Sequence, residues 1–305
     1  MNQSRGHLLT ELNNPRSHNL DQLSPLELVD LFNQEDQYTL KAIADARQEL
    51  AQAIELIANC LTQGGRMFYV GAGTSGRLGV LDAAECPPTF CTPPEMVQGI
   101  IAGGIEALTR SSEAKEDDYL AGVEAIATRG VNQLDVVIGI TAGGTTPYVH
   151  GAIAQAQTRG AKTIFVTCVP EQQVSLEVDI AIRLLTGPEL LAGSTRLKAG
   201  TATKMALNIL STGVMVRLGK VYGNRMVEVA VTNSKLRDRA IGIIQDLTDL
   251  TPEQAQEYLT LSNNNVKLAL LLQATNLTPQ AATIILEQHQ GNLGLALETY
   301  HNNHA

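Results

Sequence analysis

The fold of this chain is decided by the stretch Val70–Gly79, VGAGTSGRLG. An apolar run with aromatic and β-branched members precedes it, which is typical of a buried strand, and a segment of helical composition follows it. Where a strand turns through glycines into a helix, the first helical N–H groups lack partners in the chain and point at a ligand. The stretch therefore predicts a loop that holds a phosphate. Its expected binding residues are Gly73, Thr74, Ser75 and Gly76.

Three motifs compete for this loop. The spacing of Gly71, Gly73 and Gly76 matches the G-x-G-x-x-G pattern of dinucleotide folds, but no acidic residue follows at the required distance. A Walker loop would need G-K-[ST], which the sequence lacks here. A small phosphomonoester held by hydroxyl and N–H groups is the favoured interpretation. A purely structural turn in an α/β domain is the alternative.

Composition limits the function further. The chain has 305 residues, enough for one large or two small domains, and its hydrophobic content of 44% supports a full core. Its net charge of −9 argues against a nucleic-acid surface, so an anionic ligand must be held locally. The scattered cysteines and histidines predict no metal site and no disulfide framework. With no signal peptide and no apolar run of spanning length, a cytoplasmic protein without membrane contact is expected.

The two ends of the chain are expected to be helical. Residues 1–62 begin as a polar segment, which is either a flexible tail or an arm that reaches into a site. A capping box at Ser24–Glu27 then predicts a helix to about Asn33, and a second helix is expected from about Asp36 to Leu61. Residues 244–305 are expected to form a bundle of three short helices with a packing or interface role, because they hold no cluster of catalytic residue types.

Residues 63–243 alternate between strands and helices. Apolar strands are predicted at 67–70, 97–101, 136–140, 163–167 and 180–184, with helices near 76–84, 117–129, 148–159 and 200–218. This order predicts an α/β fold with a parallel sheet sandwiched by helices. Ligands bind such sheets at the carboxyl ends of the strands. The loops expected there, 71–76, 102–104 and 141–147, are rich in Gly, Ser or Thr.

The last of these helices follows a segment of unusual charge. Ser194 or Thr195 could cap it, while Lys198 and Lys204 would place positive charge in its early turns, against the helix dipole. A nearby anion would explain these cations. A solvated basic turn is the alternative.

Three motifs carry a family resemblance: GAGTSGRLG at 71–79, DAAECPPT at 82–89 and GSTRLKAGTA at 193–202. They resemble the N-acetylmuramic acid 6-phosphate etherase family of bacterial cell-wall recycling, which is built on the sugar isomerase (SIS) domain. The likeness runs over nearly the whole length and includes Thr10 and Glu11. It implies a lyase that cleaves the lactyl ether at C3 of the sugar, giving N-acetylglucosamine 6-phosphate and D-lactate. It also implies no cofactor and a homodimer whose sites are completed by the neighbouring subunit.

The resemblance also implies which residues act. By motif position Glu85 is the general acid, which protonates the departing lactate, and Glu116 is the general base, which removes the C2 proton of the open-chain aldehyde. The sequence places Glu85 at the end of the helix that begins at the phosphate loop, just before Pro87, where the helix dipole disfavours a carboxylate and so suits an acid. Glu116 lies in an acidic run that by itself is typical of a solvated helix start.

The second phosphate loop departs from the family pattern, which typically reads Ser-Gly-Arg-Thr-Pro. Here Gly143 and Thr145 replace the serine and the arginine, so one hydroxyl and one cation are missing. The remaining residues expected to bind the sugar phosphate are Gly144, Thr145, Thr146, Glu189, Ser194, Thr195 and Lys198. Two rival functions stay open: a non-catalytic sugar-phosphate regulator resembling the glucokinase regulatory protein, and an aldose–ketose isomerase. Retention of both Glu85 and Glu116 argues against the regulator.

Overall fold

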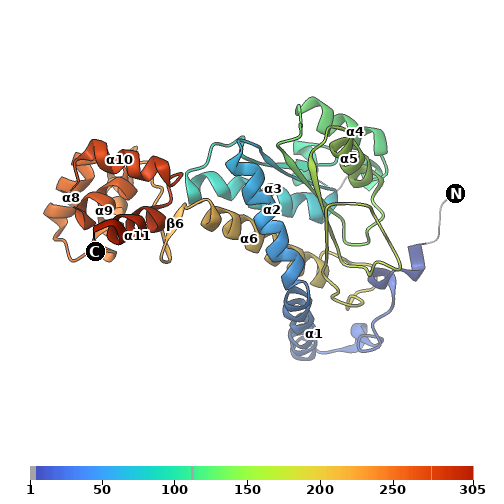
Figure 1. The fold of residues 1–305 in the computed structure, drawn as a ribbon. Coiled ribbons are helices and arrows are strands. Elements are labelled where there is room, and N and C mark those ends of the chain that lie inside the picture. Colours follow the sequence, from blue (N-terminus) through green and yellow to red (C-terminus); the bar gives the residue numbers. More distant parts are fainter. Residues whose placement is uncertain (1–4, 111–112, 276, 305) are drawn as a thin grey trace. The chain divides into compact units, whose positions relative to one another are not determined.

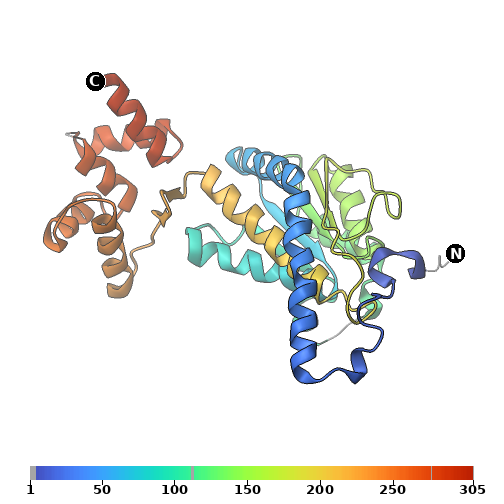
Figure 2. The same ribbon diagram turned by 90° about the horizontal axis from the view of Figure 1, so that it is seen from below.

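The computed structural model describes residues 5–110, 113–275 and 277–304 (Figures 1 and 2). The chain forms two compact units. The first comprises Met1–Glu85 and Pro93–Ser211, and the second comprises Cys86–Thr92 and Thr212–Ala305. The sequence placed boundaries at 62 and 243 instead, whereas in the structure the N-terminal helices belong to the same unit as the sheet.

A five-stranded parallel sheet forms the centre of the first unit and confirms the predicted fold class. Its strands are β1 (Met67–Gly71), β2 (Val97–Ile101), β3 (Val136–Ile140), β4 (Lys162–Thr167) and β5 (Ile180–Arg183), in the order β2-β1-β3-β4-β5. After β1 the chain adds β2 on one side and then β3 on the other. The carboxyl ends of β1 and β3 therefore flank the topological switch point, where ligands bind in such sheets.

Helices cover both faces of this sheet. Alternate residues of β1 point to opposite faces: Phe68 packs with the core beneath α4 (Tyr119–Thr128) and α5 (Pro147–Thr158), and Tyr69 lies against α3 (Gly73–Phe90). Helices α2 (Arg47–Thr62) and α6 (Lys198–Arg217) lie on the α3 side (Figures 1 and 2). Helix α1 (Pro25–Asp45) precedes α2.

Two helix boundaries differ from those predicted. Helix α1 continues to Asp45 and breaks only at Ala46, because no glycine or proline separates the two expected helices. Helix α3 continues through Pro87 and Pro88 to Phe90. Proline removes its own N–H but keeps its carbonyl, and Cys91 N donates to Pro87 O at 2.9 Å. The expected helix end at Glu85 is therefore wrong.

In the described residues of the second unit, helices are joined by one short hairpin of β6 (Val221–Tyr222) and β7 (Arg225–Met226). Its helices are α7 (Ser234–Asp246), α8 (Pro252–Leu261), α9 (Val266–Ala274), α10 (Pro279–Gln288) and α11 (Leu293–His304). The described part of 244–305 thus holds four whole helices, where three were expected. The missed start is that of α11, where Leu295 N donates to Asn292 Oδ1 at 3.1 Å.

Candidate active site

A cavity of about 410 Å³ lies at the carboxyl ends of β1 and β3. Five segments line it: the start of α3, the segment before α4 that contains Glu116, the loop from β3 to α5, the segment before α6 with the first turns of that helix, and the N-terminal arm. The structure brings eight of the residues predicted from the sequence to this cavity. They are Gly73, Thr74, Ser75, Glu116, Thr145, Thr146, Ser194 and Thr195.

The first loop depends on glycine at defined positions. A Cβ on Gly71 would lie 2.7 Å from Gly76 N, and a Cβ on Gly76 would lie 2.7 Å from Gly71 O, so neither position has room for a side chain. Gly73 adopts φ = +53°, which favours glycine. The chain can therefore turn directly from β1 into α3, and Thr74 and Ser75, both in the first turn of that helix, line the cavity. This end of the cavity suits an anion.

The second loop is held in shape by its own polar groups. Thr141 Oγ1 lies 2.8 Å from Thr146 Oγ1, and the ring nitrogen Nε2 of His150 lies 2.7 Å from Gly144 O. Gly144 has φ = +75° and shapes the turn; like Gly76 it lies outside the cavity lining. A Cβ at Gly143 would lie 3.6 Å from Thr10 Oγ1, in ordinary contact. That hydroxyl is buried and has no partner among the described residues.

Glu189 and Lys198 do not line the cavity, although both were predicted to bind substrate. The buried carboxylate of Glu189 accepts the N–H of Lys198 at 3.0 Å and that of Ala199 at 2.9 Å, and so caps α6 in place of Ser194 or Thr195. Burial raises the pKa of Glu189, although these two hydrogen bonds favour its charged form. The anion expected near this basic helix start is thus supplied by the protein itself.

The ammonium of Lys198 bonds to Glu35 on α1, and both side chains are 3% exposed. Glu35 also accepts from Asn14 Nδ2 at 2.7 Å and from Arg16 Nε at 2.7 Å. Burial opposes the ionisation of Glu35, but the hydrogen bonds from Lys198, Arg16 and Asn14 outweigh it and hold the pKa of Glu35 below its usual value. We call Glu35, Lys198, Arg16 and Asn14 the Glu35 cluster. No local sequence pattern indicates this cluster, which ties the N-terminal arm to α1 and to the start of α6.

The N-terminal segment is an arm that reaches the cavity, one of the two alternatives left open by the sequence. Its residues Arg5, Leu8 and Glu11 line the cavity wall. Arg5 Nη2 lies 3.3 Å from Asp117 Oδ1, in the acidic run that contains Glu116. The arm therefore contributes two charged side chains, those of Arg5 and Glu11, to which the sequence assigned no role.

The two predicted catalytic glutamates lie apart within one chain. Glu116 is half-buried and lines the cavity, and its main-chain carbonyl accepts the N–H of Tyr148 at 3.0 Å, which fixes it to the start of α5. Glu85 is exposed to solvent and lies within α3, away from both ends of the helix. At 1.5 Å of rise per residue it lies about 18 Å along the helix from Gly73. The helix-dipole argument for Glu85 also loses its basis, because five further helical residues follow it.

Two further arginines line the cavity, and both fall inside the motifs that carry the family resemblance. Arg77 donates from Nε to Leu108 O at 3.0 Å, which holds the segment after β2 against α3. Arg196 is exposed and lies in the segment before α6. Arg196 thus offers the cavity a cation although the second loop has Thr145 in place of the family's arginine.

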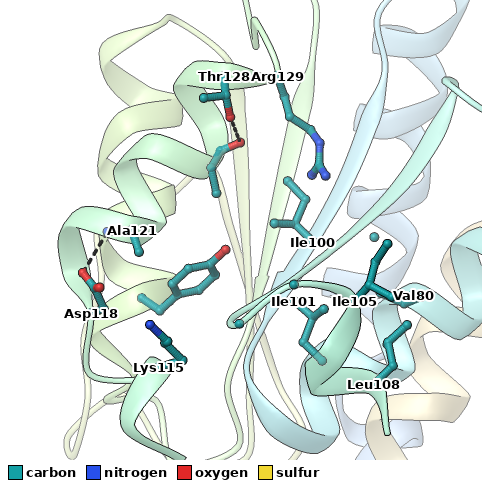
Figure 3. Close-up of a pocket in the computed structure, with 15 residues that line it drawn as sticks. Val80, Ile100, Ile101, Ile105, Leu108, Lys115, Asp118, Ala121, Thr128 and Arg129 are labelled. Carbon is teal, nitrogen blue, oxygen red and sulfur yellow. Dashed lines mark hydrogen bonds between the residues drawn. The ribbon is translucent and has the colours of Figure 1, made fainter. Parts of the chain in front are cut away.

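A second cavity, of about 540 Å³, lies along β2 at the edge of the sheet (Figure 3). Its wall is mostly apolar, with Val80, Ile100 and Leu108, and Arg129 and Lys115 lie at opposite ends of it (Figure 3). None of the predicted site residues lines it. The hydroxyl-rich cavity at the switch point is therefore the candidate active site.

The described residues lack two other features, a metal-binding cluster and a membrane-spanning helix. No group of three or more His, Cys, Asp or Glu side chains there could hold a metal ion. No helix within 5–110, 113–275 or 277–304 is long and apolar enough to cross a membrane.

The fold and the cavity define a protein of the SIS class, in which a parallel sheet carries a polar ligand site at its switch point. Three family models match accordingly: the SIS domain at 127–213, the glucokinase regulatory protein N-terminal SIS domain at 49–157, and the C-terminal lid domain of glucokinase regulatory protein at 223–290.

Curated relatives narrow this class to one family. The chain is 68% identical over 97% of its length to the N-acetylmuramic acid 6-phosphate etherase of Trichodesmium erythraeum, covering 96% of that protein. It is 67% identical to that of Synechocystis sp., again over 97% of both chains. A Picosynechococcus sp. relative with the same name is 68% identical over 97% of this chain and 99% of its own. The chain belongs to the N-acetylmuramic acid 6-phosphate etherase family.

Proposed function

We propose that the protein cleaves the D-lactyl ether of N-acetylmuramic acid 6-phosphate and releases N-acetylglucosamine 6-phosphate and D-lactate. The observation that carries this proposal is the cavity at the switch point, which combines an anion-binding loop with the carboxylate of Glu116 in a chain 68% identical to a named etherase. The phosphate binds at the start of α3, to Thr74, Ser75 and the helix N–H groups. Thr145, Thr146, Ser194 and Thr195 supply hydroxyl groups around it.

The reaction needs one base and one acid. In the open-chain aldehyde the C2 hydrogen is acidic because it lies next to the carbonyl, and the ether oxygen on C3 is a β leaving group. Glu116 removes the C2 proton, the C3–O bond breaks, and the departing lactate oxygen takes a proton from the acid. Water then adds its oxygen to C3 of the unsaturated aldehyde, and C2 regains a proton. No metal or organic cofactor takes part in these steps.

Glu85 serves as the acid only if it comes from another subunit, because it lies about 12 Å along α3 from Arg77, the cavity-lining residue of that helix nearest to it. Its exposure in the single chain leaves it available to a neighbour. A homodimer in which Glu85 of the partner subunit completes each cavity reconciles the family pattern with this geometry.

Mixing two inactive variants tests the shared site. Glu85→Gln and Glu116→Gln homodimers each lack one catalytic group at both sites, whereas a mixed dimer has one complete site. With random exchange in a two-fold symmetric dimer, about a quarter of the native activity should return. Mass spectrometry of the native dimers verifies that subunits have exchanged. If they have and no activity returns, both glutamates belong to the site of one chain.

Release of D-lactate from N-acetylmuramic acid 6-phosphate tests the function itself. We expect turnover by the unmodified protein and a loss of about 10²- to 10⁴-fold in Glu116→Gln, the usual worth of a general base. A protein that binds the sugar phosphate without lactate release would be a regulator, the class to which two of the matching family models refer. Interconversion of glucosamine 6-phosphate and fructose 6-phosphate would indicate an isomerase.

A further inference from the structure

The arm residue Glu11 faces the same cavity as Glu116. Glu11 ends the short helix Leu9–Glu11 and lines the cavity beside the segment that precedes α6. A Cβ on Gly193 would lie 2.9 Å from Glu11 Oε2, so the carboxylate packs directly over that glycine. Gly193 has φ = +74°, and the absence of a side chain there leaves room for the carboxylate.

The carboxylate of Glu11 is not engaged elsewhere in the described part of the chain. It has no hydrogen bond or ion pair there, in contrast to Glu35 and Glu189, whose oxygens accept from buried donors. The Glu11 side chain is exposed, and the space that it faces is the cavity. It is therefore free to accept hydrogen bonds from a ligand.

The arm holds Glu11 in a fixed place. The Gln173 side chain accepts the N–H of Leu9 at 2.8 Å and donates to the carbonyl of His7 at 3.0 Å, which fastens the arm on the N-terminal side of Glu11. On the other side, Ser17 Oγ donates to Leu190 O at 2.7 Å, and Asn14 bonds to the buried Glu35. A ligand group held by pre-positioned elements loses little entropy on binding.

Charge decides which part of a ligand Glu11 can contact. A carboxylate accepts hydrogen bonds but donates none, and it repels a phosphate. Given the proposed phosphate position at the start of α3, Glu11 must face the neutral part of the ligand, whose hydroxyl and amide N–H groups are donors. We infer that Glu11 is a substrate-binding residue that accepts hydrogen bonds from the sugar, so that the cavity selects a sugar phosphate over a bare phosphate.

Equilibrium binding of two probes tests this role. Calorimetry with N-acetylglucosamine 6-phosphate and with inorganic phosphate is compared between the unmodified protein and Glu11→Gln. Asp21→Asn is the matched control, because it makes the same change on the arm at an exposed residue outside the cavity. Thermal unfolding confirms that each variant is folded.

We expect Glu11→Gln to weaken binding of the sugar phosphate by about 10- to 100-fold, the worth of hydrogen bonds to a charged group. Binding of inorganic phosphate should stay unchanged or tighten, and Asp21→Asn should change neither. Equally weaker binding of both ligands would show that Glu11 only shapes the site. Unchanged binding of both ligands would show that Glu11 is not part of the site. If the unmodified protein binds neither probe, the phosphate assignment fails and the role of Glu11 fails with it.

Discussion

The substitution Glu35→Gln should destabilise the first unit by far more than an ordinary surface change. The side chains of Glu35 and Lys198 are each 3% exposed, and the glutamine would be neutral while the ammonium stays buried. Removing one partner of a buried ion pair costs about 3–5 kcal/mol, because the remaining charge is left uncompensated. Arg16 is 43% exposed and water can solvate it after the change, so Lys198 accounts for most of the loss.

Urea unfolding followed by far-ultraviolet circular dichroism measures this loss, and suits a chain that has no tryptophan. Because the chain has two compact units, the transition of each is fitted separately. The double variant Glu35→Gln/Lys198→Met should recover most of the stability, since an apolar pair replaces the lone charge. Asp45→Asn is the control, because it breaks an ion pair with Lys41 at the surface. The side chains of Lys41 and Asp45 are 67% and 63% exposed, and such a pair is worth about 0.5 kcal/mol or less. A cost below about 1 kcal/mol for Glu35→Gln, or no recovery in the double variant, would refute this account of the cluster.

Four further outcomes are expected. The pKa of Glu35 is lower in the folded state than the unfolded carboxyl pKa of about 4.3, so its ionised form stabilises the fold above that pH, and this stability is lost as pH falls through the folded-state pKa. Glu35→Gln should therefore flatten the acid side of a plot of unfolding free energy against pH, and an unchanged acid side would contradict this. Ser75→Ala should raise KM for the 6-phosphate substrate by the equivalent of about 1.5–3 kcal/mol, and an unchanged KM would remove Ser75 from the site. Gly143→Ser should raise the free energy of unfolding by about 1 kcal/mol, because its hydroxyl can partner the buried Thr10 hydroxyl, and a lower value would show that the loop has no room for it. Exhaustive chelation should leave lactate release unchanged; loss that zinc or magnesium restores would overturn the cofactor-free mechanism.

Local patterns in the sequence predicted the sheet and the glycine-rich turn from β1 into α3 because each depends on neighbouring residues. The run that ends at Val70 is apolar along its whole length, as a strand buried on both faces must be, and Gly71, Gly73 and Gly76 mark the turn that follows. Hydroxyl-rich loops at strand ends were likewise visible, and Thr145, Thr146, Ser194 and Thr195 do line the cavity.

Long-range pairing could not be predicted in this way. Lys198 and Glu35 are 163 positions apart, so nothing local showed that the lysine binds inside the protein rather than at the ligand. The prolines after Glu85 indicated a helix end that the structure does not have. The polar arm has no periodicity that would reveal its docking, and Glu11 was recognised in a family motif without a role.

Exchange of the C2 hydrogen of the substrate with deuterated water tests most directly whether the carboxylate in this cavity starts the reaction. Unmodified protein, Glu116→Gln and Glu85→Gln are each incubated with N-acetylmuramic acid 6-phosphate, and the recovered substrate is analysed by mass spectrometry. We expect Glu116→Gln to lose both exchange and lactate release, and Glu85→Gln to lose lactate release while it still exchanges C2, because the base remains. Exchange that persists in Glu116→Gln and disappears in Glu85→Gln would contradict the assignment of the base to this cavity.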